Sequence, residues 1–139
     1  VHLMEHKSYK LMKDGQHIII SGVRNPLTWK EWWFAFTTFP ADDFILLLTH
    51  TPDYAEDTDV SNANLVLAGH THGGQVSLFK KYSPVKHSIY GNRFLTGRKE
   101  NSAGVPIIIT NGLGTSRMNV RLFTPSEVVL VVLHRVEKK

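Results

Sequence analysis

The sequence contains no cysteine, and this absence rules out two kinds of structure. A disulfide framework needs paired cysteines, and many structural zinc sites are built on thiolates. Any metal site in this chain must therefore rely on imidazole nitrogens and on carboxylate or other oxygen ligands. The redox compartment cannot be inferred from a chain that has no thiol.

Long apolar runs are missing as well. Residues 128–133 form one of the longest, and they are far fewer than the roughly 20 residues that a membrane-spanning helix needs. No signal-like segment opens the chain, which begins with Val1 in a polar stretch. We therefore expect it to be part of a longer protein, with any membrane anchor lying upstream of Val1.

The composition shows neither low complexity nor internal repeats. Of the 139 residues, 42% are hydrophobic and 20% are charged, which is ordinary for one globular domain. The net charge of +4 comes from scattered basic residues rather than from a concentrated patch. Because a weak, dispersed positive charge explains only mild attraction to anions, we do not expect nucleic acid as a partner.

Short apolar segments separated by polar turns dominate the chain and predict an α+β fold with several strands and few helices. Residues 27–37 carry aromatic side chains at helical spacing and predict a helix packed on a core, while residues 52–56 predict one helical turn. The predicted strands cover residues 17–23, 44–48, 65–68, 75–79, 93–96, 105–110 and 127–136. The segment 44–48 is apolar throughout, so we expect it to be covered on both faces.

Histidines follow two of the predicted strands directly. His50 comes after residues 44–48, and His70 and His72 come after residues 65–68 within Gly-His-Thr-His-Gly-Gly. In an extended segment His70 and His72 would point the same way, whereas a tight glycine turn would splay them toward two neighbouring ions. Histidines at separate strand ends of one sheet edge therefore predict a metal site.

Other residues allow weaker interpretations. A single histidine is more often a surface or core residue than a ligand, and we assign His2, His6, His17, His87 and His134 to that class. The carboxylates Asp42, Asp43, Asp53, Asp57 and Asp59 lie in predicted loops. Asp53 is close to His50 in sequence and would either orient an imidazole or be a carboxylate of a surface turn.

The turn Asn111-Gly112-Leu113-Gly114-Thr115-Ser116 follows the predicted strand 105–110. Backbone amides and hydroxyls in such a turn can hold an anion, although a structural hairpin fits equally well. An arginine can grip a phosphate with two nitrogens, and Arg117 and Arg121 lie close by, either as phosphate ligands or as exposed cations. The candidate phosphate-binding residues are Gly114, Thr115, Ser116 and Arg121.

Three stretches together resemble the calcineurin-like metallophosphoesterases. They are Leu-Leu-Thr-His-Thr-Pro-Asp-Tyr-Ala-Glu at 47–56, Asn-Leu-Val-Leu-Ala-Gly-His-Thr-His-Gly-Gly-Gln-Val at 64–76, and Asn-Gly-Leu-Gly-Thr-Ser at 111–116 with Val120-Arg121-Leu122. The similarity is greatest to a bacterial branch whose members often carry an N-terminal membrane anchor or export signal. This resemblance implies a bacterial protein that is cytoplasmic or membrane-associated.

The resemblance also implies a fold, a cofactor and a reaction. The family fold is a four-layer αββα sandwich with two divalent cations, such as manganese, zinc or iron, at strand ends. By resemblance, His50 and His70 bind one cation and His72 binds the other, and a hydroxide bridging the metals attacks the phosphorus of a phosphoester substrate. Such a site suits neutral pH because bound water loses its proton more easily.

The chain departs from the family pattern at its carboxylates. The family motifs Asp-x-His, Gly-Asp-x-x-Asp and Gly-Asn-His do not occur in it. We therefore expect residues 1–139 to form a single, partial domain without the N-terminal metal-binding half, and to be inactive in isolation. Its expected partners are that missing half or another copy of the chain. The alternative is a non-catalytic binding or assembly module built on half of the fold.

Overall fold

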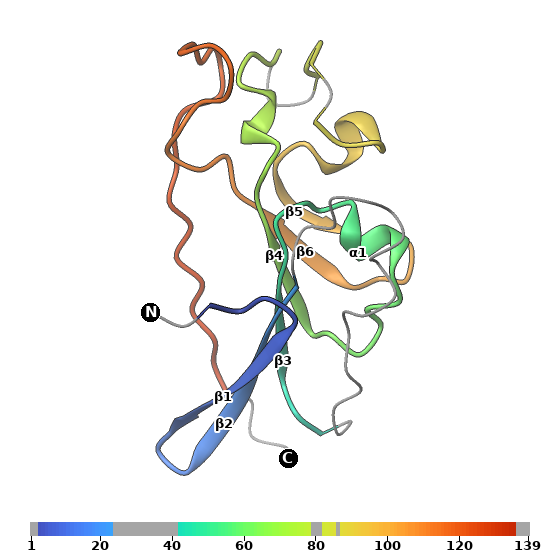
Figure 1. Cartoon of the computed structure of the whole chain (residues 1–139), viewed down its shortest axis with the longest axis vertical. Coiled ribbons are helices and arrows are strands. Elements are labelled where there is room, and N and C mark those ends of the chain that lie inside the picture. The colour runs from blue at the N-terminus through green and yellow to red at the C-terminus, as the bar shows by residue number, and fades with distance from the viewer. Residues whose placement is uncertain (1–2, 24–41, 79–81, 86, 136–139) are drawn as a thin grey trace.

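The computed structural model describes residues 3–23, 42–78, 82–85 and 87–135, and these residues form one six-stranded sheet (Figure 1). The strands are β1 (Lys7–Lys13), β2 (Gln16–Gly22), β3 (Ile45–Leu48), β4 (Leu65–Ala68), β5 (Gly97–Glu100) and β6 (Pro106–Ile109). Their order across the sheet is β1-β2-β3-β4-β6-β5. The sheet is mixed: β2, β3, β4 and β6 run parallel, and β1 and β5 add antiparallel edges.

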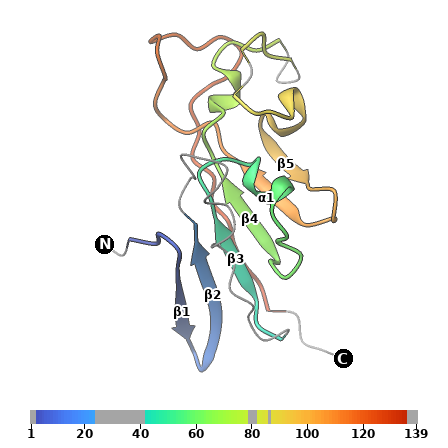
Figure 2. The same ribbon diagram turned by 45° about the vertical axis from the view of Figure 1, so that its right-hand side comes forward.

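The core lies on one face of the central strands. Leu47, Val66, Ile107 and Ile109 alternate with half-buried neighbours and are almost completely buried, as a two-residue period requires. They pack with Tyr54 and Ala55 of the helical turn α1 (Tyr54–Asp57) and with Phe94 of a 3₁₀ turn (Gly91–Phe94). Figures 1 and 2 show α1 standing over this side of the sheet.

Among the described residues, an extended segment at 128–133 lies against the opposite face of β4 and β6 (Figure 1). Leu67 and Ile108 on this face, together with Val129 and Val131, line a cavity of about 120 Å³. The alternate side chains of the segment point outward, and Val128, Leu130 and Val132 are 80%, 86% and 61% exposed. The segment therefore has the alternation of a strand, although Val129 on the side toward the sheet is still 42% exposed.

Several predicted elements are confirmed. The strands predicted at 17–23, 44–48, 65–68 and 105–110 correspond to β2, β3, β4 and β6, and the turn predicted at 52–56 corresponds to α1. The helix predicted at 27–37 lies outside the described residues. The expected mixture of strands with little helix is thus present, and none of the described helices is long and apolar enough to cross a membrane.

Other predictions were wrong. Residues 93–94 end the 3₁₀ turn and residues 95–96 form a bend, so the strand begins only at Gly97 and continues to Glu100, where it pairs with β6. Of the strand predicted at 75–79, the described residues make only isolated bridges from Val76 and Leu78. In the last predicted strand, Glu127 N donates to the Gly112 carbonyl at 3.1 Å, but residues 128–135 are extended and pair with no strand of the described chain. The strand β1 was missed because all seven of its side chains are exposed.

Candidate metal centre

The parallel strands bring three functional segments to one edge of the sheet. His50, the turn that begins at Gly69, and Asn111 follow β3, β4 and β6, which are neighbours. Backbone hydrogen bonds continue past the strand ends, from Gly69 N to the His50 carbonyl at 3.1 Å and from Thr110 N to the Ala68 carbonyl at 3.0 Å. The backbone hydrogen bonding of the sheet therefore extends to the first loop residues.

His50 and His70 face one another across this edge. Nε2 of His50 lies 3.0 Å from Nδ1 of His70, and the ring centroids are 4.8 Å apart. Two imidazole nitrogens that bind one cation at about 2.0–2.1 Å lie roughly 2.9–3.4 Å apart when the ion subtends an angle of about 90–110°. The observed separation thus fits a shared cation as well as it fits a direct hydrogen bond.

The turn that carries His70 has an unusual backbone. The φ angles of His70, His72 and Gln75 are 69°, 50° and 52°, and Gly73 and Gly74 are also positive at 60° and 80°. Positive φ is uncommon for residues other than glycine, and clusters of it occur where a functional site demands a particular side-chain direction. Here it makes the segment a tight turn rather than an extended strand, in which the His70 ring meets His50 and the His72 ring meets Gly114.

His72 points to a different part of the site. Its Nδ1 lies 3.1 Å from the carbonyl oxygen of Gly114. Because a carbonyl only accepts, Nδ1 carries the proton, and Nε2 of the neutral ring keeps its lone pair free. That arrangement is typical of metal-binding histidines, whose second nitrogen is fixed by a carbonyl or carboxylate. The described residues contain no group of three or more histidine, aspartate or glutamate side chains that could hold one ion.

Two residues that sequence reasoning set aside belong to this region. The His87 ring lies 6.1 Å from the His70 ring at an angle of 89°, so its assignment to surface or core positions missed a neighbour of the site. Asp53 is only 8% exposed, and its carboxylate accepts hydrogen bonds from the Ser88 hydroxyl at 2.5 Å and from Ile89 N at 2.9 Å. The interpretation of Asp53 as a surface-turn carboxylate is therefore wrong.

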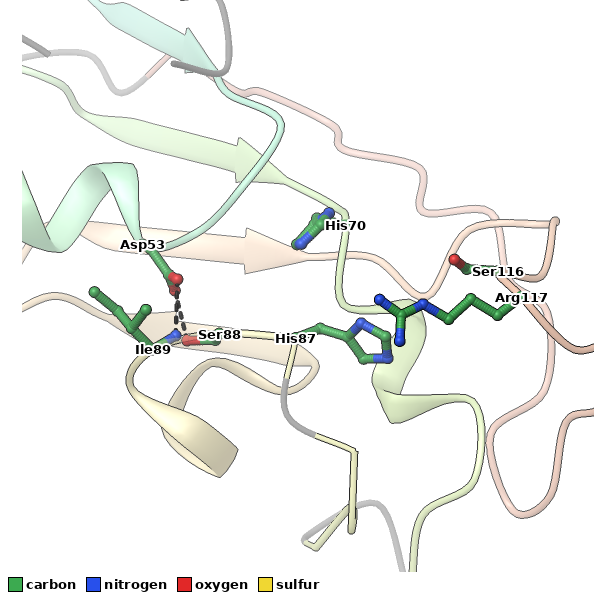
Figure 3. Close-up of a pocket in the computed structure, with 7 residues that line it drawn as sticks. All are labelled: Asp53, His70, His87, Ser88, Ile89, Ser116 and Arg117. Carbon is green, nitrogen blue, oxygen red and sulfur yellow. Dashed lines mark hydrogen bonds between the residues drawn. The ribbon is translucent and has the colours of Figure 1, made fainter. Parts of the chain in front are cut away.

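A cavity of about 500 Å³ opens beside these residues (Figure 3). No sequence signal identified His87, because it lies in an irregular stretch without a motif, and only the path of the chain brings it to His70. Asp53 fixes the loop after His87 by binding Ser88 and Ile89. The cavity is lined by Asp53, His70, His87, Ser88, Ile89, Ser116 and Arg117.

The surroundings of His70 and His87 favour the neutral form of both rings. Burial lowers the pKa of His70, and the nearby rings of His50 and His87 lower it further, while the Asp53 carboxylate opposes them. Burial also lowers the pKa of His87, with contributions from His72 and from the Arg117 guanidinium. A neutral ring has the lone pair that binds a cation, so these shifts are compatible with metal ligation.

Arg121 links the turn at residues 69–75, here called the histidine turn, to the turn at residues 111–116 through hydrogen bonds. Its terminal nitrogens donate to the carbonyls of His72 at 3.2 Å and Asn111 at 2.9 Å, and also to those of Gly112, Gly114 and Thr124. These bonds favour a structural role over the phosphate contact predicted for this arginine. Gln75 links the histidine turn to the residues that follow Thr115. Its amide nitrogen donates to the carbonyls of Met118 and Val120, and its amide oxygen accepts from Ser116 N.

The other candidate phosphate-binding residues lie at different places in the turn. The Gly114 carbonyl already accepts bonds from His72 and Arg121, and Thr115 is exposed and donates to Asn119 at 3.4 Å. Of this set, Ser116 alone lines the cavity. Arg117, which the sequence offered as a second possible phosphate ligand, lines it too and is exposed.

Comparison with known proteins gives several relatives of one kind. The chain is 36% identical over 90 residues to the uncharacterized metallophosphoesterase YkuE of Bacillus subtilis, which is 65% of this chain and 31% of that protein. It is 34% identical over 88 residues to the uncharacterized metallophosphoesterase Cj0846 of Campylobacter jejuni, covering 63% of this chain and 22% of that protein. An uncharacterized metallophosphoesterase of Aquifex aeolicus is 36% identical over 90 residues, which are 65% of this chain and 33% of that protein.

The matched region spans about a third or less of the length of these relatives. No family model and no solved structure matches the chain. The sequence similarity nevertheless covers roughly two thirds of this chain in each of the three comparisons, at identities of 34–36%. The resemblance noted in the sequence is thereby confirmed, and the chain is a homologue of the metallophosphoesterases.

Proposed function

We propose that this chain is the histidine-bearing part of a phosphoester hydrolase that uses two divalent cations. The observation that carries the proposal is the 3.0 Å separation between Nε2 of His50 and Nδ1 of His70, at the ends of adjacent parallel strands. These two nitrogens would hold one cation, and the free Nε2 of His72 would hold the second. Manganese, zinc and iron all accept imidazole, so the residues do not select among them.

When bound, the cations lower the pKa of water and offset the negative charge that develops on a phosphoryl group. The chain's own residues orient the ligands. The Gly114 carbonyl fixes the tautomer of His72, and Arg121 holds that carbonyl in place. Carboxylate ligands would come from outside the described residues, because no acidic residue among them joins the histidines in a group able to bind an ion. We therefore infer that the isolated chain is inactive.

The proposal extends to the fold. The described sheet would be one of two central sheets in a four-layer αββα sandwich, and residues 127–133 would belong to the second. In support, Val129 and Val131 line a cavity with Leu67 and Ile108, while Val128, Leu130 and Val132 expose a second apolar side. Isolated apolar strands with open edges are rare on soluble surfaces, because they invite pairing.

The experiment uses the protein at its full natural length, including whatever flanks this chain in its reading frame. We expect it to hydrolyse an aryl phosphate in the presence of manganese, and we expect H70A and H72A each to lose most of that activity together with bound manganese. His134 is exposed and lies on the C-terminal segment, so H134A is the matched control. Full activity and full manganese content in the H70A/H72A double variant would contradict the proposal.

A non-catalytic assembly module remains the second candidate. The observation that favours it is the absence of a complete ligand group among the described residues, together with the open apolar side of residues 127–133. The two candidates differ in what precedes Val1. A flanking segment with Gly-Asp and Gly-Asn-His motifs supports the hydrolase, whereas a start codon directly at this position supports the module.

A further inference from the structure

Arg117 and His87 share one side of the cavity beside the His50–His70 pair. Figure 3 shows the Arg117 guanidinium directed toward the His87 ring, with Ser116 next to it and Asp53 at the other end. Arg117 comes from the loop after β6 and His87 from the loop before the 3₁₀ turn, so these residues meet only in the folded chain. Neither belongs to the motifs on which the family resemblance rests.

The Arg117 side chain is positioned by an uncommon turn. Its φ is 63°, and Met118 N donates to the Ser116 carbonyl at 2.7 Å, which closes a three-residue turn around it. Gln75 anchors the same loop to the histidine turn, because its side chain accepts from Ser116 N and donates to Met118 and Val120. The backbone at Arg117 is therefore anchored to the turn that carries His70 and His72.

The Arg117 guanidinium, the Ser116 hydroxyl and the His87 ring can each donate a hydrogen bond at this end of the cavity. Among the described residues, neither the Arg117 guanidinium nor the Ser116 hydroxyl has a hydrogen-bond partner, and the His87 ring lies edge-on to the His70 ring with the Arg117 guanidinium beside it (Figure 3). The one carboxylate of the cavity, Asp53, is already satisfied by Ser88 and Ile89. A cavity of about 500 Å³ is large enough for a small ligand.

We propose that Arg117, His87 and Ser116 bind the anionic phosphate group of the substrate and present it to the neighbouring histidine pair, an inference that rests on the proposed function. A guanidinium binds phosphate with two parallel hydrogen bonds, and an imidazole N–H and a hydroxyl each add one. The phosphate occupies the Arg117 end because the Asp53 carboxylate repels it from the other. The organic part of the substrate then extends toward Ile89, which is 76% exposed.

The test measures steady-state hydrolysis of an aryl phosphate by the full-length, manganese-loaded protein, and competitive inhibition by inorganic phosphate. We expect R117A to raise KM and the inhibition constant for phosphate by about 10- to 100-fold, with H87A producing a smaller rise. R117K keeps the positive charge but loses the planar guanidinium that donates two parallel hydrogen bonds. Its KM and its inhibition constant for phosphate should therefore lie between those of R117A and those of the unchanged protein. Arg135 is exposed on the C-terminal segment, so R135A is the matched control and should change neither constant.

The outcomes separate this inference from the proposed function. Unchanged KM and unchanged phosphate inhibition in R117A would overturn the inference while leaving the hydrolase intact. Loss of bound manganese in R117A, with no effect specific to phosphate, would also overturn it, because the arginine would then support the fold alone. If the unaltered protein hydrolyses nothing yet binds inorganic phosphate, and R117A abolishes that binding, the anion site stands and the hydrolase assignment fails.

Discussion

The side chain of Asn111 occupies the space that a β-carbon on Gly73 would need. Asn111 cannot move aside easily, since it is 2% exposed and its Oδ1 accepts a hydrogen bond from the Thr96 hydroxyl at 2.7 Å. Gly73 also has a φ of 60°. The histidine turn and the turn after β6 thus fit together only because this position has no side chain.

We therefore expect G73A to destabilise the protein by at least about 2 kcal/mol, the sum of overpacking and backbone strain. Gly112 provides the matched control, because its φ is 65° but a β-carbon there would meet nothing within 4 Å. G112A should cost only about 1 kcal/mol, from the backbone alone. Urea denaturation measures the loss in the free energy of unfolding for both variants. Equal losses would show that the close packing around Gly73 does not contribute to the effect of G73A.

The buried carboxylate of Asp53 holds the loop that carries His87. In D53N the amide oxygen can still accept from Ile89 N, but the NH2 group can no longer accept from the Ser88 hydroxyl, and the negative charge that strengthens both bonds is lost. We expect a loss of about 1–3 kcal/mol in the free energy of unfolding. Asp59 is exposed and bonds only within its own turn, so D59N should have no measurable effect. Comparable losses in the two variants would contradict the role assigned to Asp53.

Acidification should weaken the fold through His70. Burial, followed by the neighbouring imidazoles, lowers the pKa of His70 in the folded state below its ordinary value of 6.5. The unfolded chain then binds more protons than the folded one just below pH 6.5, so the free energy of unfolding falls as the pH drops through that range. Denaturation at a series of pH values should show this loss, and H70Q should reduce it. A loss of the same size in H70Q would assign the effect to other groups.

The two sides of the C-terminal segment should respond differently to a polar residue. V131D places a charge against Leu67 and Ile108 and should destabilise the isolated chain by about 2 kcal/mol or more. L130D alters a side chain that is 86% exposed and should leave the isolated chain's stability within about 0.5 kcal/mol.

In the full-length protein, by contrast, L130D should be as harmful as V131D if a second layer covers this side. Thermal unfolding of both variants in both lengths of protein gives the comparison. Sedimentation of the isolated chain adds a further measurement, since L130D should reduce any self-association through the open side. Tolerance of L130D in the full-length protein would contradict the proposed sandwich.

Local pattern predicted the strands that matter for the site. β3, β4 and β6 are short apolar runs bounded by polar turns, and each was predicted within a residue of its observed end. Prediction failed where strand formation depends on a partner. The strand β1 has seven exposed side chains and forms because β2 pairs with it, whereas residues 127–135 have the right pattern but no described strand beside them.

For the site, the sequence by itself determined which residue types are available and where they stand along the chain. Glycine-flanked histidines after apolar strands could be identified because their chemistry is local. Only the tertiary structure decided that His50 lies 3.0 Å from His70, that His72 turns to Gly114, and that His87 and Asp53 belong beside them. These relationships depend on parallel strand order and on loops that return to one sheet edge, and such long-range contacts leave no periodic signal in the sequence.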